Sequence, residues 1–425
     1  MPEHGDWENA LIGSGGGRLT LVSAVLCLSS ALDMVAPVVA NHHLRVCHAA
    51  GSLAVEMGLS QRSVEDVCLA CLLHDIGVLS LRERLDTLDF DSNDKHHAEF
   101  GYRLLRQWKA LEKPALLVRA HHDAYCDKRE GLGGHIIHLA DRIDVLLDRS
   151  RFVLDQVPDV TQRILAGAGT EFHPDVVEAF RALAGRDSFW LDMHSPSIRA
   201  IVEKETPQSR FLSMDGSNME AVVEFGKLVA RVIDYRSHFT ATHSSGVAAS
   251  AEALSLAFDF SPQRASLMRV AGYLHDLGKL ATPNEILEKP GPLTKSEMRI
   301  VRAHPYHTLG LLGGVPQLGD LARWAAFHHE RPSGGGYPFN LDRGKLSREA
   351  RIMAVADVFT AITEDRPYRA GMERARAFGV LGKMADSGTL CAECVDLLQQ
   401  NFDQVNNVRA TEQQQARQVY GIVAD

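Results

Sequence analysis

Histidines and carboxylates gather in a fixed order in the C-terminal half of this 425-residue chain. Five imidazoles and two carboxylates stand out: His243, His275, Asp276, His304, His328, His329 and Asp357. Imidazole and carboxylate ligands without a thiolate suit manganese, iron, cobalt, nickel or zinc. Seven ligands exceed the needs of one ion. The residues therefore predict two divalent ions about 3.5–4 Å apart, with Asp276 as a candidate bridge.

The same series occurs earlier in the chain. Its members are His42, His74, Asp75, His97, His121, His122 and Asp141. In each copy the first two histidines are 32 positions apart, and the third and fourth are 24 positions apart. An isolated histidine is usually an ordinary surface or core residue, but a repeated series with equal spacings indicates duplication. The first copy is a second candidate metal site, with the neighbouring His43 and His96 as alternative ligands.

The two copies differ in two loops. His275 and His304 are 29 positions apart, whereas His74 and His97 are 23 positions apart. The segment before the last carboxylate is also longer in the second copy. These longer loops contain its most distinctive residues, Lys289-Pro290-Gly291 and Gly336-Tyr337-Pro338.

The second copy resembles the HD-GYP branch of the HD superfamily of metal-dependent phosphohydrolases. The resemblance runs from His243 to Arg369. Its motifs are His275-Asp276-Leu277-Gly278-Lys279, Lys289-Pro290-Gly291-Pro292-Leu293-Thr294, His304-Pro305, His328-His329-Glu330, Gly336-Tyr337-Pro338 and Asp365-Arg366-Pro367-Tyr368-Arg369. It implies an all-helical bundle that hydrolyses a cyclic dinucleotide to a linear dinucleotide or mononucleotide. Cyclic di-GMP is the first expectation, and cyclic GMP-AMP is the second.

The resemblance also implies roles for individual residues. The seven histidines and aspartates match metal ligands, for iron or manganese first and nickel, cobalt or zinc as alternatives. Asp276 and Lys279 match catalytic positions, the lysine facing the scissile phosphate. Gly336 and Tyr337 match the substrate loop. Arg366 and Arg369 match phosphate-holding positions, although they could instead cap or salt-bridge a helix end.

Three positions of the second copy depart from the family pattern. Phe239 stands where many members have a glutamate that helps to hold a third metal, so two metals are expected. Ser333 and Thr360 replace aspartates near the nucleotide side, which leaves the preferred cyclic dinucleotide open.

The first copy lacks the substrate-handling residues of the second. Val78 occupies the position of Lys279, and Gly131-Leu132-Gly133-Gly134 lies in the shortened loop. Metal ligands without a substrate loop suggest a degenerate or regulatory domain, although a different phosphohydrolase substrate stays open.

Helices must position these residues, because strand patterns are scarce. Val222, Phe225, Val229 and Val232 recur at helical spacing. We therefore expect an all-α chain of two tandem HD-type helical bundles. The first domain covers residues 1–184, a connector covers 185–217, and the phosphodiesterase domain covers 218–425.

The composition is that of a globular protein with a net charge of −9, so we expect no direct nucleic-acid binding. Seven cysteines, an odd number, favour a reducing cytoplasm. Two pairs, Cys68/Cys71 and Cys391/Cys394, lie in apolar helical patterns and favour buried helices over a shared zinc site. The apolar stretch 19–40 is interrupted by Asp33 and Pro37, which favours a buried helix over a membrane span. A homodimer is left open.

Two other functions compete with cyclic-dinucleotide hydrolysis. One is a catalytically silent module that senses a cyclic dinucleotide, and the complete ligand set with Lys279 argues against it. The other is an HD phosphohydrolase acting on another nucleotide, against which the Gly-Tyr-Pro loop argues.

Overall fold

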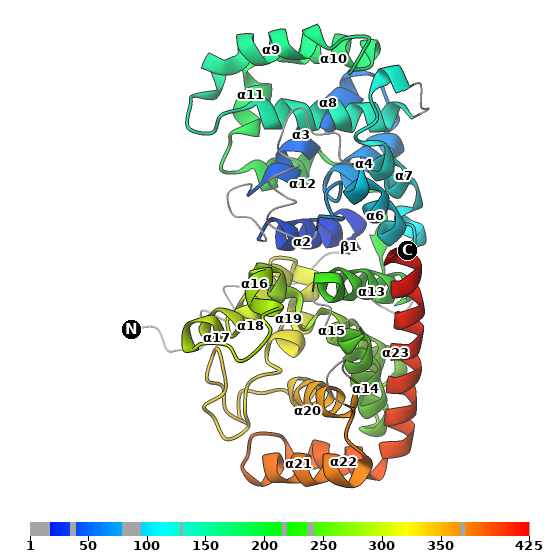
Figure 1. The fold of residues 1–425 in the computed structure, drawn as a ribbon, viewed down its shortest axis with the longest axis vertical. Helices are drawn as coiled ribbons and strands as arrows, with labels where there is room; N and C mark the ends of the chain where they lie inside the picture. Colours follow the sequence, from blue (N-terminus) through cyan, green and yellow to red (C-terminus); the bar gives the residue numbers. More distant parts are fainter. Residues whose placement is uncertain are drawn as a thin grey trace. The chain divides into compact units, whose positions relative to one another are not determined.

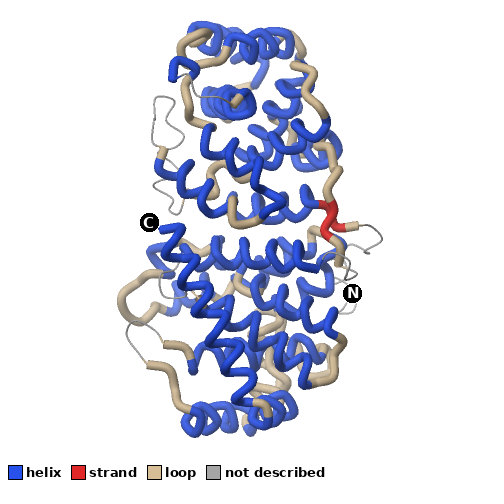
Figure 2. Tube along the Cα trace, turned by 90° about the vertical axis from the view of Figure 1, so that its right-hand side faces the viewer, coloured by secondary structure: helices blue, strands red, loops and turns tan. Residues whose placement is uncertain are grey.

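The computed structural model describes residues 18–34, 40–78, 95–127, 131–214, 219–236, 242–365 and 370–424. Their regular secondary structure is almost entirely helical (Figures 1 and 2), as the sequence predicts. The sheet in this part of the chain is one pair of two-residue strands, β1 (Leu19–Thr20) and β2 (Phe211–Leu212). The chain divides into two compact units. We call Thr20–Phe211 the N-terminal unit. The other unit, which we call the C-terminal unit, comprises Leu212–Asp425 and, of the described residues before Thr20, Arg18 and Leu19.

The N-terminal unit is built around one helix, α3. Its helices are α2 (Leu21–Asp33), α3 (His42–Glu56), α4 (Gln61–Cys71), α6 (His96–Leu105), α7 (Glu112–Ala120), α8 (Leu132–Leu146), α9 (Val157–Ala166), α10 (Pro174–Ala184), α11 (Asp187–Met193) and α12 (Ile198–Glu205). Helix α3 packs against α4, α8 and α12. Part of the segment expected as a connector therefore forms helices that complete this unit.

The C-terminal unit is built around α14. Its helices are α13 (Met219–Arg236), α14 (His243–Ala257), α15 (Pro262–Leu274), α16 (Asn284–Leu287), α17 (Lys295–Val301), α18 (His304–Gly313), α19 (Gly319–Ala326), α20 (Arg348–Thr363), α21 (Arg374–Asp386), α22 (Ala392–Gln400) and α23 (Phe402–Ala424). Helix α14 packs against α15, α20 and α23, and the long α23 runs along it in Figure 1.

Local sequence signals set the ends of the helices that carry the site. Ser261 accepts a hydrogen bond from the Arg264 amide, and Pro262 occupies the first turn of α15. The helix ends at Leu274, so His275 and Asp276 lie at its C-terminus and not on one helical face. Ser347 caps α20 in the same way. These helix ends place polar side chains inside the bundle.

Glycines allow the next histidine of each copy to approach the His-Asp turn. A Cβ atom on Gly278 would lie 2.0 Å from the backbone oxygen of His304. A Cβ on Gly77 would lie at the same distance from the oxygen of His97. Only glycine fits such a contact. The glycine after each His-Asp pair therefore brings the start of α18, or of α6, against that turn.

Two remaining sequence expectations concern apolar segments. Helix α2, within the stretch 19–40, is buried along nearly its whole length. Within the described residues, no helix combines the length and apolar character needed to cross a membrane. Cys68 and Cys71 lie inside α4 as expected. The expectation is wrong for Cys391, which precedes α22 and occupies its N-cap position.

Candidate metal centre

Helix ends of the C-terminal unit bring the seven ligand candidates of the second copy together. His243 begins α14, His275 and Asp276 follow α15, His304 begins α18, His328 and His329 follow α19, and Asp357 lies within α20. All are buried except His329, which is partly buried. Buried ionisable groups in such numbers require partners or a bound ion.

The side chains form two groups that share one carboxylate. His243, His275 and Asp276 form one group, and His304, His328 and His329 form the other. Within each group the ligand atoms lie within 4.8 Å of one another. Asp276 Oδ2 lies 3.2 Å from His275 Nε2, whereas Oδ1 lies 3.3 Å from His304 Nε2. One carboxylate thus presents an oxygen to each group, which is the arrangement of a bridging ligand.

Backbone carbonyls orient three of the imidazoles. His275, His304 and His328 each donate Nδ1–H to the carbonyl oxygen three residues earlier, at 2.8, 2.8 and 2.6 Å. This bond fixes the tautomer in which Nε2 carries a lone pair. Each Nε2 then faces the inside of the cluster as a metal ligand would.

The Nε2 atoms of His304 and His328 lie 3.2 Å apart. Burial lowers the pKa of His304 to about 3 and that of His328 to about 4, so both rings are neutral near pH 7. With both Nδ1 protons donated to carbonyls, neither Nε2 can donate to the other. Two lone pairs at this distance repel each other unless a cation lies between them. The donor set therefore fits a divalent metal ion.

His243 is held by carboxylates on both ring nitrogens. Its Nε2 lies 3.0 Å from Asp357 Oδ1, and its Nδ1 lies 3.3 Å from Glu364 Oε2. Burial opposes protonation, but Glu364 and Asp357 together raise the pKa of His243 to about 10. Glu364 also accepts a 3.0 Å hydrogen bond from Gln413 of α23. Sequence reasoning did not identify Glu364, which follows α20 outside the ligand series.

Lys279 lies beside the shared carboxylate. Its Nζ is 2.5 Å from Asp276 Oδ2. Burial disfavours the charged lysine, but Asp276 outweighs it and raises the pKa of Lys279 above its usual value. The lysine is thus a fixed cation next to both groups, at the position that the family resemblance assigns to it.

The side chain of Glu330 holds the Gly-Tyr-Pro loop against the metal ligands. Glu330 accepts hydrogen bonds from the amides of Phe339 at 2.7 Å and Leu341 at 2.9 Å. A Cβ on Gly336 would lie 2.5 Å from the Glu330 Cα, so this position requires glycine. The Tyr337 ring stacks on His329, with centroids 4.7 Å apart and planes at 27°. Gly336 and Tyr337 therefore border the cluster.

Sequence reasoning missed one cation at this loop. Arg302, at the end of α17, is exposed and holds its guanidinium 4.2 Å from the centroid of the Tyr337 ring. Its position two residues before His304 is the signal that could have found it. Arg366, Arg369 and Phe239 lie outside the described residues.

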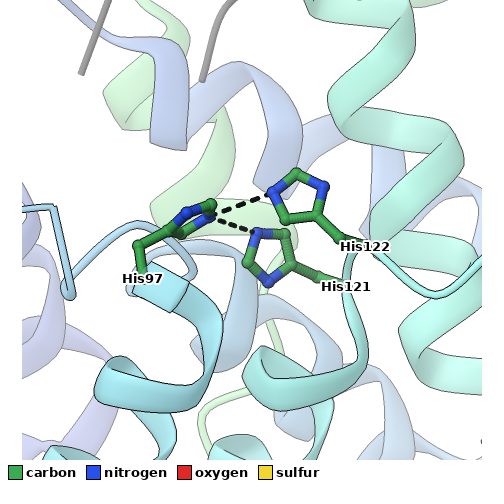
Figure 3. A group of neighbouring side chains, drawn as sticks. All are labelled: His97, His121 and His122. Atoms are coloured by element: carbon green, nitrogen blue, oxygen red, sulfur yellow. Dashed lines mark hydrogen bonds between the residues drawn. The ribbon is translucent and has the colours of Figure 1, made fainter. Parts of the chain in front are cut away.

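The first copy repeats this geometry within the N-terminal unit. His42, His74 and Asp75 form one group, and His97, His121 and His122 form the other. In Figure 3 the Nε2 of His97 faces those of His121 and His122, at 3.3 and 3.0 Å. Asp75 again divides its oxygens, with Oδ2 3.4 Å from His74 Nε2 and Oδ1 3.5 Å from His97 Nε2.

The alternative ligands of the first copy belong to neither group, although the His43 ring lies 5.2 Å from that of His74. His43 Nδ1 is 3.0 Å from Asp33 Oδ1, and His96 is exposed. Asp141 Oδ1 lies 3.3 Å from His42 Nε2 and completes the series.

A buried arginine distinguishes the first copy from the second. Arg142 donates from Nε and Nη2 to Asp141 Oδ2, at 3.2 and 2.7 Å. The residue after Asp357 is Val358, which cannot make this contact. Val78 occupies the position of Lys279. The buried cation of the first copy, Arg142, therefore contacts Asp141 and not Asp75.

Comparisons with known proteins agree with this duplicated architecture. Two sequence models of the HD domain match residues 39–146 and 227–390. The chain is 30% identical to 3'3'-cGAMP-specific phosphodiesterase 1 of Vibrio cholerae, over 91% of this chain and 93% of that protein. It is 41% identical to a cyclic di-GMP phosphodiesterase of Pseudomonas aeruginosa, over 33% of this chain and 34% of that protein.

A solved structure shares the fold. The crystal structure of a cyclic GMP-AMP-specific phosphodiesterase of V. cholerae superposes with a TM-score of 0.62 at 24% identity, over 91% of this chain and 98% of that one. The fold and the two histidine-aspartate sites define a tandem HD-domain protein. The long relationship to a curated enzyme is more specific, and the chain belongs to the HD-domain phosphodiesterase family.

Proposed function

We propose that the C-terminal unit hydrolyses a cyclic dinucleotide with two divalent transition-metal ions, held by the seven residues of the second copy. The proposal rests on the position of Asp276. Its two carboxylate oxygens face two separate histidine groups, at 3.2 and 3.3 Å. Iron or manganese suits these ligands best, and nickel, cobalt and zinc are the alternatives. His243 and Asp357 complete the first group.

The chain's own residues supply the remaining requirements of phosphodiester cleavage. Bound metal would supply a hydroxide nucleophile near neutral pH and would polarise the phosphoryl oxygens. Lys279 places a fixed positive charge where negative charge develops in the transition state. Tyr337 and Gly336 form a surface against which a base or ribose can pack. The Arg302 guanidinium supplies a positive charge for a substrate phosphate. The backbone bonds of the histidines prevent the site from reorganising during the reaction.

Three relatives suggest the substrate. A relative that aligns over 91% of the chain is named for 3'3'-cGAMP, and relatives named for cyclic di-GMP align over 33% and 54% of the chain. We therefore place 3'3'-cGAMP beside cyclic di-GMP, which the sequence alone favoured. Ser333, where the family pattern has an aspartate, lies three residues before Gly336 and is consistent with a changed preference. Thr360, the other departure from the pattern, is fully buried.

The test is anaerobic purification followed by metal analysis and incubation with 3'3'-cGAMP, cyclic di-GMP and an acyclic control such as bis(p-nitrophenyl) phosphate. Chromatography would identify the linear product. We expect close to two ions per C-terminal site and turnover of at least one cyclic dinucleotide. Tight binding of a cyclic dinucleotide without turnover, in fully metal-loaded protein, would favour the sensing module instead.

We also propose that the N-terminal unit binds metal without hydrolysing a cyclic dinucleotide. Its two histidine groups and divided Asp75 carboxylate support metal binding. Val78 and the absence of a Gly-Tyr-Pro sequence argue against cyclic-dinucleotide turnover. Metal that stays bound in a His275→Ala/Asp276→Ala variant would support this division, and a metal-free variant would refute it.

A further inference from the structure

Cys391 and Cys394 lie at the start of a helix, outside the metal site. Cys391 is the residue before α22, and Cys394 is in the first turn. The unpaired amides of a helix N-terminus favour negative charge, and a Cys-x-x-Cys pair placed there is the usual setting of a reactive thiolate. Both cysteines are free thiols in this structure.

A basic side chain faces the first thiol. Arg351 of α20 donates from Nη1 to Cys391 Sγ at 3.4 Å. A hydrogen bond from Cys394 and the contact with Arg351, against the effect of burial, lower the pKa of the Cys391 thiol to about 5. The same pairing and burial raise the pKa of Cys394 far above its usual value. The contacts of the pair therefore favour a thiolate at Cys391 and a protonated thiol at Cys394.

The other Cys-x-x-Cys pair of the chain lacks these features. Cys68 and Cys71 lie inside α4, at its C-terminal end, where the helix dipole disfavours a thiolate. Burial raises the pKa of Cys71 well above its ordinary value. Cys68 and Cys71 have the same spacing as Cys391 and Cys394 but lie at the opposite end of a helix. They therefore provide an internal control for the reactivity of the second pair.

The segment before Cys391 supports the substrate loop. The amide of Ser333 donates to the carbonyl of Gly388 at 3.0 Å. A Cβ on Gly388 would lie 2.8 Å from the Ser333 Cβ, so the Ser333 side chain packs directly against the Gly388 backbone. Gly388 precedes Cys391 by three residues, and Ser333 precedes Gly336 by three. A change at the start of α22 therefore has a direct route to the loop that carries Tyr337.

We propose that Cys391 and Cys394 are a redox-active dithiol, oxidised to a disulfide by a small peroxide and restored by a thiol reductant, and that its state adjusts the Gly-Tyr-Pro loop. The Cys391 thiolate attacks a peroxide oxygen and becomes a sulfenic acid, releasing hydroxide or alkoxide. The Cys394 thiol then attacks that sulfur, forming the disulfide and releasing water. Two electrons pass from the dithiol to the peroxide, and two reductant thiols return them. Cys391 is only 2% exposed, which favours a small oxidant.

Mass spectrometry tests the chemistry without any need for activity. The full-length protein is treated with hydrogen peroxide, alkylated and digested. We expect a Cys391–Cys394 disulfide that dithiothreitol reverses, while Cys68 and Cys71 remain alkylated thiols. An Arg351→Met variant should form the disulfide several-fold more slowly, and a Cys394→Ser variant should leave a sulfenic acid that dimedone traps. Oxidation of Cys68 and Cys71 at an equal rate, or an unmodified Cys391 in folded protein, would overturn the proposal.

The effect on the loop rests on the proposed function and has its own measurement. We expect the oxidised protein to show a several-fold change in KM for the cyclic dinucleotide with unchanged metal content. A Cys391→Ser/Cys394→Ser variant given the same peroxide controls for oxidation of the metal and should keep its KM. A disulfide that forms but leaves KM unchanged would refute the coupling. Lack of turnover in the reduced protein would count against the proposed function and not against the dithiol.

Discussion

Glu364 Oε2 lies 3.3 Å from Nδ1 of His243, and it takes the place that Asp144 holds beside His42 in the first copy. Asp144 follows Asp141 by three residues, and its counterpart after Asp357 is Thr360, which cannot accept the imidazole proton in the same way. A carboxylate one helical turn later supplies the contact instead. The two copies therefore orient their first histidine by different residues.

Glu364→Gln should weaken the metal site without removing a ligand. The amide keeps the shape of the side chain but loses the charge that orients His243, and losing such a partner typically costs 10–100-fold in metal affinity or activity. Metal titration of the apo-protein and kcat at saturating metal would measure the two effects. Glu373→Gln removes an exposed carboxylate nine residues later in the chain and is the matched control. Equal metal affinity in the two variants would show that Glu364 is only structural.

Asp276→Ala should abolish hydrolysis and lower the bound metal. This carboxylate is the side chain placed between both histidine groups, so its loss removes a ligand from each ion. Metal analysis and a turnover assay on protein with a normal circular dichroism spectrum would check both effects. Full metal content with normal turnover would refute the assignment of Asp276 as the bridge.

Lys279→Ala should keep the metal but lose about 10²–10³ in kcat, the usual effect of removing one transition-state charge stabiliser. Lys279 contacts Asp276 through its charge and contributes no metal ligand. The informative comparison is kcat at full metal occupancy, with Lys289→Ala as a control. That lysine pairs with Glu297 of α17 and not with the cluster. Wild-type turnover in the Lys279→Ala variant would show that Lys279 only neutralises the charge of Asp276.

Arg302→Met should raise KM while metal content stays the same. The guanidinium lies over the Tyr337 ring at the edge of the site, where it can hold a substrate phosphate and steady the ring. An exposed cation of this kind contributes about two- to tenfold in affinity. Arg299→Met, an exposed arginine in the same helix, provides the control. If both variants bind substrate equally well, Arg302 has no special role.

Much of the site follows from the sequence because its ligands repeat at fixed spacings on helix ends. The duplication identified all fourteen residues that the structure gathers into two clusters, seven in each copy. Glu364, Glu330 and Arg302 could not be found in this way. Glu364 and Arg302 lie outside the repeated series, and the bonds of Glu330 depend on how the loop folds back onto it. Their roles arise from tertiary contacts, which spacing along the chain does not encode.

We expect only the second copy to hydrolyse the cyclic dinucleotide, and paired double variants can test this. Hydrolysis needs an activated water together with groups that position and neutralise the substrate. The second copy has Lys279, Tyr337 and the loop that Glu330 holds, whereas the first has Val78 and a buried Arg142 on Asp141.

His275→Ala/Asp276→Ala should therefore remove cyclic-dinucleotide hydrolysis entirely. His74→Ala/Asp75→Ala should leave the C-terminal site competent, with roughly wild-type kcat, and should lower the metal content and thermal stability of the N-terminal unit. Turnover, metal analysis and thermal melting would be compared at matched folding, judged by circular dichroism. If the folded first-copy variant loses all turnover, or the second-copy variant retains it, catalysis does not reside where the substrate loop and lysine lie. Bound metal alone can activate water, but a site with neither a lysine beside the shared carboxylate nor a loop that contacts the nucleotide cannot hold the phosphodiester in line with that water.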